Sequence, residues 1–406
     1  MENDLSFNQV ATILNSLQAQ ATGASAITAT DTSSFVACAT TTLKTGYDAV
    51  YQAIATVLGK TIFSMRPYSA KLKGMMISEP QFKLHTRKLQ LSDNTWDDNE
   101  AVKWPVTYDS THTSPDDPYG NGASVDMQKI KKAKPLQTNF YGMNTFQDSY
   151  TIFDEGQLEV AFSSPDEFAM FWTMVTTNIM DRLEQARENS ARAILVNMAA
   201  TCSALNDGGR VIHLLTEYNA RTGKSLTTTT VYDPANYPDF VRWAFGRIAA
   251  LSSLMTERST KFQTTLTGHP IPRHTPTARQ RLYIYAPEEM QMRANVLSTT
   301  FHDQFLQLGD HELVNFWQSI NSPDGINAKP GYMAASGAAT IHPSAITFSG
   351  MFGLLMDEEA GGYAPVRSKI EAAPHNAAGG YTTFWLKEYH KLYMDNSEKI
   401  ILFILD

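Results

Sequence analysis

Cysteines are scarce in this sequence and belong to no recognisable motif. Only two occur among the 406 residues, Cys38 and Cys202, and they lie far apart. A disulfide-rich fold needs several cysteines, and a cysteine zinc site needs closely spaced pairs of them. The sequence therefore excludes both, and its low cysteine content suits a protein of a reducing compartment.

Segments for export or membrane insertion are also missing. The first residues, Met1 to Asp4, lack the basic and apolar regions of a signal peptide. The longest purely apolar run extends from Ile400 to Leu405 and is far too short to cross a bilayer. We therefore expect no membrane partner.

The chain has no excess of basic residues. Its 33 lysines and arginines are outnumbered by 41 aspartates and glutamates, which gives a formal charge of −8 at pH 7. A protein that binds nucleic acid through a large basic face usually has the opposite balance. The 43% of hydrophobic and 18% of charged residues indicate a globular protein, long enough for about two or three domains.

Catalytic, cofactor and metal motifs are absent as well. Arg221 to Ser225 ends like a phosphate-binding loop, but Tyr218 stands where that loop needs a glycine. The acidic run from Asp93 to Glu100 lacks the central glycine of a calcium loop. The densest titratable cluster fits no zinc motif and is more typical of a surface or a helix end; it comprises His302, Asp303, Asp310, His311 and Glu312. We therefore expect no catalytic residue, cofactor or metal.

One long stretch, 164–205, does have a strong pattern. Ser164 suits an N-terminal cap, Pro165 the first helical position and Glu167 the third, and no proline or glycine interrupts the stretch afterwards. Apolar residues recur at helical spacing from Phe168 to Met198. The opposite face carries charges, namely Asp181, Arg182, Glu184, Arg187, Glu188 and Arg192. The pattern predicts a single helix roughly 60 Å long.

Two strand patterns upstream of this helix flank a long polar stretch. Residues 83–91 alternate like a strand with one wet face, and the aromatic-rich segment Phe140 to Phe153 predicts a second strand. Residues 93–126 between them are polar and acidic. We predict a protruding hairpin with too few apolar residues to fold alone, so we expect it to lie on a neighbouring subunit.

Charged residues in this polar stretch are our candidates for contacts between subunits. The basic group is Lys129, Lys131, Lys132 and Lys134, and the acidic group is Asp97, Asp98, Asp116 and Asp117. Such lysines can meet carboxylates of another copy or a phosphate backbone. A solvated loop without any partner explains them about as well.

The rest of the chain alternates between short helical and strand patterns. We predict an N-terminal arm rather than a compact domain, with helices at 6–19 and 47–58 and a flexible linker at 21–34. Downstream we predict helices at 238–255, from 286 through 297, and at 313–320, and strands at 227–231, 281–285, 346–348, 381–393 and 399–405. The turn residues Asp395 to Ser397 predict that the last two strands form a hairpin.

Three segments resemble the major capsid proteins of tailed bacteriophages. They are Asn139 to Phe162 leading into the long helix, the strand-to-helix step Tyr285-Ala286-Pro287-Glu288-Glu289, and the aromatic finish from Trp385 to Tyr393 before Phe403. The order of parts is also similar to that family, and it is most like the proteins of small short-tailed phages. The resemblance implies an α+β protein of the Hong Kong 97-type capsid fold.

The resemblance also implies a division of the chain and a set of partners. Residues 1–66 would form the N-terminal arm and the helix that follows it, 67–160 the extended loop and the start of the peripheral domain, 161–205 its spine helix, 206–375 the axial domain, and 376–406 the C-terminal strands returning to the peripheral domain. The chain would assemble with itself as pentamers and hexamers into an icosahedral virion capsid. Scaffolding and portal proteins and packaged DNA, bound without sequence specificity, would be the other partners, with assembly in the host cytoplasm.

Two other functions remain open from the sequence. The first is a cytoplasmic α/β enzyme, such as a hydrolase that uses His302, Asp303 and Glu312. An enzyme should gather polar residues in one pocket, whereas a shell subunit should present a projecting hairpin. The second is a protein nanocompartment of the same capsid fold, which would lack scaffolding and portal partners.

Overall fold

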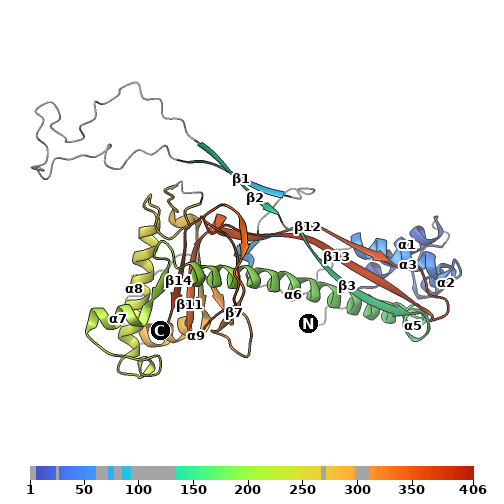
Figure 1. Ribbon diagram of the computed structural model, residues 1–406. Helices are drawn as coiled ribbons and strands as arrows, with labels where there is room; N and C mark the ends of the chain where they lie inside the picture. Colours follow the sequence, from blue (N-terminus) through green and yellow to red (C-terminus); the bar gives the residue numbers. More distant parts are fainter. Residues whose placement is uncertain are drawn as a thin grey trace, which may run out of the picture.

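A single long helix runs through most of the length of the molecule (Figure 1). The computed structural model describes residues 6–23, 27–60, 72–76, 85–92, 134–141, 143–266, 271–297 and 311–406. The long helix is α6 (Pro165–Leu205, 41 residues). Ser164 Oγ accepts a hydrogen bond from the Glu167 N–H at 3.2 Å, and Asn206, with φ of 43°, ends the helix. The predicted spine helix is therefore confirmed.

Three helices pack together at the far end of α6, which corrects the prediction of an arm without compact packing. They are α1 (Phe7–Thr22), α2 (Thr32–Leu43) and α3 (Tyr47–Lys60). Leu14, Phe35 and Tyr51 are fully buried in one cluster with Trp172 of α6. The sequence analysis missed α2 because its run of threonine, serine and alanine has a weak pattern, and burial against α6 decides its conformation instead.

A three-stranded antiparallel sheet lies along the first half of α6. Its order is β12 (Gly361–Ala372), β13 (Tyr381–Met394) and β3 (Met143–Phe153). Alternate residues of β13 are buried, as expected for a strand with one face on a core. Between β3 and α6 the chain forms one π turn (Asp154–Leu158) and the short helix α5 (Glu159–Ala161).

The predicted hairpin upstream of β3 is confirmed in its first strand only: the predicted second strand, 140–153, is mostly β3 and pairs with β13, and the hairpin partner comes from the residues before it. β1 (His85–Ser92) pairs antiparallel with β2 (Lys134–Tyr141), and His85 lies opposite Tyr141. The hairpin extends over the top of the molecule in Figure 1. Its polar tip, residues 93–133, lies outside the described residues.

The other end of α6 packs on a mixed five-stranded sheet. The strand order is β4 (Val211–His213), β14 (Ile400–Ile404), β11 (Met351–Asp357), β5 (Gln280–Tyr285) and β6 (His311–Val314). Every residue of β11 and β14 is buried, because both faces of the sheet are covered. Leu354 and Leu402 contact the cluster that contains α6, and Leu355 and Phe403 contact a cluster on the other face.

Helices α7 (Leu214–Thr222) and α8 (Tyr237–Met255) supply the second face of this sheet, and α9 (Ala286–Leu297) follows β5. The predicted helices at 238–255 and from 286, and the strand at 281–285, are confirmed. Four short strands complete this end of the molecule, and two antiparallel pairs join them: β7 (Ile326–Ala328) with β10 (Ile346–Phe348), and β8 (Gly331–Met333) with β9 (Ala339–Ile341).

Two predicted elements are wrong. Residues 227–231 form a turn and the start of a short 3₁₀ helix (Thr230–Tyr232), because the Thr227 hydroxyl accepts the Thr230 N–H at 3.2 Å. Residues 313–320 contain the end of β6 and turns, not a helix. Pairing with β5 and burial of Trp317, whose indole N–H donates to the Met351 carbonyl at 2.9 Å, override the local helical spacing.

The predicted C-terminal hairpin is also wrong. β13 and β14 lie in different sheets, so the segment between them crosses from one sheet to the other. This segment is buried: Asn396 donates its side-chain amide to the Met333 carbonyl at 2.9 Å and to Thr264 Oγ1 at 3.0 Å. β14 therefore belongs to the five-stranded sheet, whereas β12 belongs to the three-stranded one. The boundary expected at residue 375 falls between β12 and β13, which pair with each other.

Candidate assembly interfaces

Most of the residues that we predicted to contact other subunits lie outside the described residues. These are Lys129, Lys131, Lys132, Asp97, Asp98, Asp116 and Asp117. Lys134 is the first residue of β2, opposite Ser92 of β1. The structure therefore brings the roots of the predicted charged segment together but leaves the contacts themselves as a prediction.

The titratable cluster considered for an enzyme does not form one site in the described part of the chain. His302, Asp303 and Asp310 are outside it. His311 Nε2 lies 2.9 Å from Glu289 Oε1, whereas Glu312 Oε1 accepts the Gly74 N–H at 2.7 Å. Burial raises the pKa of Glu312 above its ordinary value. The neighbouring residues thus serve two separate contacts, and Glu312 fastens the short 3₁₀ helix Lys73–Met75 to β6.

A pocket of about 250 Å³ lies near the end of β14. Its most buried carboxylate, Glu288, accepts hydrogen bonds from Tyr232 at 2.7 Å and Tyr237 at 2.5 Å, so both of its oxygens are occupied. Among the described residues, no group of three or more His, Cys, Asp or Glu side chains could hold a metal ion. In the same part of the chain, no helix is long and apolar enough to span a bilayer.

Buried ion pairs are concentrated at the middle of α6. Arg187 binds Glu388 of β13 through two hydrogen bonds, of 3.0 Å and 2.7 Å, and binds Glu184 at 2.6 Å. The Glu388 side chain is only 2% exposed. A bidentate arginine–carboxylate pair fixes both distance and orientation. Arg187 therefore holds α6 at a defined angle to the three-stranded sheet.

A second pair lies one turn further along α6. Arg192 binds Glu188 at 2.5 Å, and its guanidinium carbon is 3.7 Å from the centre of the Phe316 ring. Arg192 also donates to the Phe316 carbonyl. The pairing agrees with the predicted spacing of one turn, but the face is buried rather than exposed because the segment after β6 covers it.

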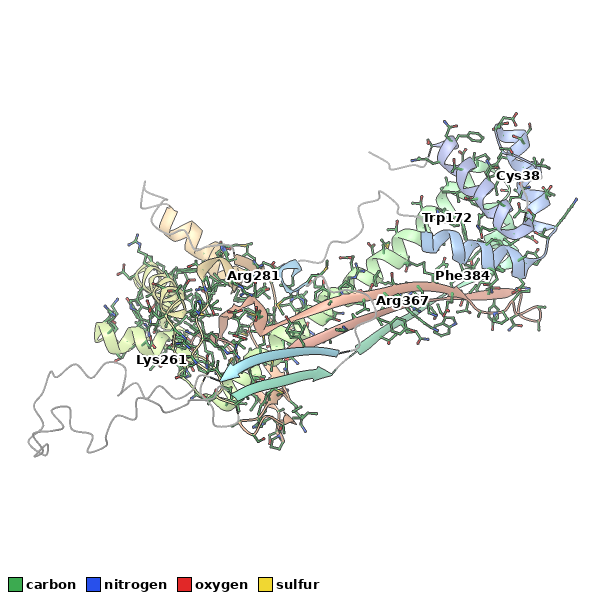
Figure 2. The ribbon with its side chains drawn as sticks, turned by 90° about the horizontal axis from the view of Figure 1, so that it is seen from above. Cys38, Trp172, Lys261, Arg281, Arg367 and Phe384 are labelled. Atoms are coloured by element: carbon green, nitrogen blue, oxygen red, sulfur yellow. The ribbon has the colours of Figure 1, made fainter. Side chains whose placement is uncertain are left out.

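These ion pairs lie between two separate hydrophobic cores. Phe168 to Leu183 of α6 belong to the core with α1–α3 and the three-stranded sheet, and Ala191 to Cys202 belong to the core with the five-stranded sheet. Figure 2 labels Trp172 and Phe384 at one end of the molecule and Arg281 at the other. One helix therefore connects two bodies, and charged contacts stiffen it where the cores leave a gap.

The far end of the three-stranded sheet is fastened by a buried polar network. Tyr51 of α3 donates to Asp154 Oδ1 at 2.6 Å, and His375 Nε2 lies 3.3 Å from Asp154 Oδ2. Burial, followed by the hydrogen bond to Asp154, raises the pKa of Tyr51 strongly, so its hydroxyl stays protonated and donates. The network joins the N-terminal helices to the loop between β12 and β13.

Apolar side chains remain exposed on both ends of this elongated molecule. On α6, Met170 and Met174 lie one turn apart on the face opposite the core and are 58% and 52% exposed. Near β9, Ile341 is 73% exposed beside a groove of about 610 Å³ between α6, the β8–β9 pair and the end of β13. These side chains are exposed singly, which is common on protein surfaces and does not by itself mark an interface.

A comparison with protein-family models finds a match over most of the chain. The model described as Phi29-like phage major capsid protein matches residues 108–404. The chain belongs to this family. A search among curated proteins finds no match.

Solved structures agree with a phage capsid fold. The capsid structure of Staphylococcus phage Andhra is similar with a TM-score of 0.52 at 10% identity, covering 85% of this chain and 87% of that chain. A structure of the head fiber and inner core protein gp22 of native bacteriophage P68 is similar with a TM-score of 0.51 at 9% identity, again covering 85% and 87%. At such low identity the likeness concerns the fold alone.

The resemblance noted in the sequence is thereby confirmed. This member of the Phi29-like capsid family is an α+β protein of the Hong Kong 97 type. It is a structural major capsid protein that assembles with copies of itself into the shell of the virion. Family membership favours the phage shell over both a nanocompartment and the enzyme that the sequence left open.

Sequence reasoning missed the buried ion pairs as a functional feature. Arg187 and Glu388 are separated by some two hundred residues, and no local pattern connects them. The spacing of Glu188 and Arg192, four residues apart, was a sequence signal for an ion pair. It could not indicate burial, because buried and exposed pairs share the same spacing of one turn. The exposed methionines were also missed, since the sequence places them within the same helix as the core residues.

Proposed function

We propose that this capsid protein occupies both pentamers and hexamers of an icosahedral shell around the DNA genome of a tailed phage. The observation that supports this is the construction of α6 as one stiff helix between two cores. A subunit that serves in two kinds of ring needs a rigid body together with adaptable contacts at its ends. Arg187 and Arg192 supply the rigidity at the junction.

The two bodies have different roles in this proposal. The five-stranded sheet with α7, α8 and α9 forms the axial domain, which gathers around the ring axes. The spine helix, the three-stranded sheet and α1–α3 form the peripheral domain. Relative to the division expected from the sequence, β12 moves to the peripheral domain and β14 to the axial domain, in accordance with their strand pairing.

The extended hairpin would reach a neighbouring subunit. In that position Lys129, Lys131, Lys132 and Lys134 meet carboxylates of the next copy, with Asp97, Asp98, Asp116 and Asp117 as candidates. Opposite charges that meet at an interface contribute orientation and association rate more than affinity. Many such contacts around a closed shell add up to a stable particle.

A charge-reversal experiment tests this contact. Replacement of the four lysines by glutamate should abolish shell formation while the free subunit keeps its melting temperature. A second variant, in which the four aspartates are also replaced by lysine, should form shells again. Normal shells from the first variant would contradict the proposed role of these residues.

Scaffolding and portal proteins and packaged DNA are the further partners that we propose, with assembly in the host cytoplasm. The acidic composition suits a shell that encloses DNA without binding its sequence. Electron microscopy of the protein expressed alone and with the neighbouring genes of its genome tests the whole proposal. Closed shells with five-fold and six-fold rings are expected, and a small oligomer under both conditions would contradict it.

A further inference from the structure

The two edges of the three-stranded sheet differ in how they are protected. The outer edge of β12 is closed by its own chain: Met76 forms a bridge with Tyr363, Pro365 has no N–H to offer, and a bulge interrupts the register before Arg367. Proline, bulges and charged side chains are the usual means of blocking an edge strand. β3 pairs with β13 in regular register and contains no proline, and among the described residues no other strand or bridge lies on its outer edge.

The direction of the free backbone groups of β3 follows from one hydrogen bond. The Asp154 N–H donates to the Gly380 carbonyl at 2.9 Å, in continuation of the β3–β13 register. Hydrogen-bonded pairs recur at every second residue of an antiparallel ladder. The odd-numbered residues of β3, among them Thr145 and Gln147, therefore direct their N–H and C=O groups away from β13.

Only part of this edge is available to a partner. The Ser149 N–H is taken by Asp148 Oδ1 at 2.8 Å, and the Phe153 N–H is taken by Gln157 Oε1 at 3.0 Å. Asp148 is itself held by Arg182 at 2.5 Å. The open stretch is therefore Met143 to Gln147, and the Asp148 carboxylate marks its end.

The hairpin β1–β2 is the second unpaired element. In the described part of the chain it forms a sheet of only two strands. A hairpin without a third strand is marginally stable in water. Only one residue separates β2 from β3 in the sequence, which is too short a connection for the hairpin to fold back on the β3 edge of its own chain.

Charge does not oppose pairing of these two elements between copies. β1 contains His85, Arg87 and Lys88 and no acidic residue, whereas β3 contains Asp148 as its only charged residue. A shell brings copies of the chain together at high effective concentration, which makes a short strand contact sufficient.

We propose that the free edge of β3, from Met143 to Gln147, binds strand β1 of a second copy of this chain. The added strand extends the three-stranded sheet across the subunit boundary, and main-chain hydrogen bonds supply its affinity. This inference rests on the proposed contact of the extended hairpin with a neighbour and specifies the surface that receives it. Each copy donates one hairpin and receives one, so the contacts form a ring rather than a pair.

Cysteine pairs test the contact directly in assembled shells. Thr145→Cys is combined in turn with a cysteine at each position of 86–91 in β1, and the shells are oxidised and analysed on a denaturing gel. Every second position in β1 should give covalent multimers larger than a dimer, because side chains alternate between the faces of a sheet. The two native cysteines, Cys38 and Cys202, are fully buried and do not compete.

Two controls make the result decisive. The pair Arg87→Cys and Asn139→Cys, opposite each other in β1 and β2, should form a link within one chain and so report an intact hairpin. Arg367→Cys on the protected edge of β12, combined with the same β1 positions, should give no multimers. Shells that contain the intact hairpin but no multimers from Thr145→Cys would overturn the inference. Failure of the unaltered protein to form shells would instead overturn the proposed function.

A proline variant gives an independent measurement. Thr145→Pro removes one outward N–H without touching the β13 ladder, and we expect at least about tenfold fewer shells from it. Thr151→Pro removes an outward N–H beyond Asp148 and should assemble normally. Equal assembly of the two folded variants would contradict the assignment of the open stretch.

Discussion

A fully buried lysine closes the C-terminal end of α8. Lys399 Nζ donates to the carbonyls of Glu257 at 2.6 Å and Met255 at 3.2 Å. These carbonyls have no partner within the helix, and a cation there also meets the negative end of the helix dipole. Burial lowers the pKa of Lys399, and the carbonyl oxygens compensate for the lost water. The residue thus joins β14 to α8.

We predict that Lys399→Met destabilises the free subunit by about 2 kcal/mol, because it removes the hydrogen bonds that a fully buried ammonium group makes to the Glu257 and Met255 carbonyls. Lys387→Met is the matched control, since Lys387 binds Glu371 near the surface and should change stability by less than about 1 kcal/mol. Urea unfolding of the unassembled protein measures both. Equal effects of the two variants would contradict the importance of the buried contact.

His390 makes the stability of the free subunit depend on pH. Its ring is buried on β13, and burial lowers its pKa below 6.5 despite the nearby Glu388 carboxylate. The unfolded chain therefore binds a proton before the folded chain does. The contribution to stability is present above pH 6.5 and is lost as the pH falls through the lower pKa of the folded state.

We expect the free subunit to lose stability between pH 7 and pH 5, and His390→Gln to reduce that loss. His274→Gln, at an exposed position, should leave the loss unchanged. Urea midpoints at the two pH values measure the difference. A loss of the same size in all three proteins would show that other groups cause it.

Among the elements, the close approach of β12 to α6 depends on one glycine. A Cβ atom at Gly361 would collide with the end of Met198 and would lie 3.0 Å from the Tyr393 carbonyl oxygen. The side chain of Met198 could move, but the backbone carbonyl of the paired strand could not. Glycine therefore allows the sheet to start directly on the spine helix.

Gly361→Val should destabilise the subunit by about 2 kcal/mol through overpacking. Gly246→Ala is a control of opposite sign, since a Cβ there meets nothing within 4 Å and alanine favours a helix by about 0.5 to 1 kcal/mol. Thermal unfolding of both variants tests the pair. An unchanged melting temperature for Gly361→Val would mean that the sheet can move away from α6.

A helix or strand can be predicted from the sequence when the residues that determine it lie within the element itself. α6 could be predicted because a cap at Ser164, a long apolar stripe and Asn206 all lie within it. β13 could be predicted because one of its faces is exposed and its pattern alternates. The pairing of β14 could not, because a strand buried on both faces has no alternation to indicate its neighbours.

For the whole molecule, α6 transmits orientation between two cores. The core around Trp172 and the core around Met198 share this helix and the ion pairs at its middle. In the shell that we propose, the two ends contact different neighbours, so their relative orientation matters for assembly. The position of Gln185, exposed and between the cores, allows a test of the connection.

Gln185→Pro should kink α6 and cost about 3 kcal/mol or more. We expect both cores to retain secondary structure but shell formation to fail, because the ends no longer match neighbouring copies. Gln185→Ala should fold and assemble normally. Circular dichroism and electron microscopy measure the two properties, and normal shells from the proline variant would contradict a requirement for a straight helix.

The sequence identified charged residues as candidates for subunit contacts but indicated no partner for any of them. Lys134 lies opposite Ser92 at the end of the hairpin, where no strand was predicted for it, and the residues beyond them stay a prediction. The sequence of β3 could not indicate its free edge, because strand pairing in the folded protein decides which edge stays unpaired. The same reason applies to Arg187 and Glu388, which meet only after the sheet has packed on α6.

The sequence by itself determined the spine helix, the first strand of the hairpin, the absence of a disulfide framework and the likeness to a capsid family. These depend on neighbouring residues and on order along the chain. The tertiary structure alone decided which sheet receives β12 and β14, that α1–α3 form a packed end, and that β3 has an edge that no other described strand occupies. Burial and strand pairing join residues that are distant in the chain, and a local pattern carries no information about its partner.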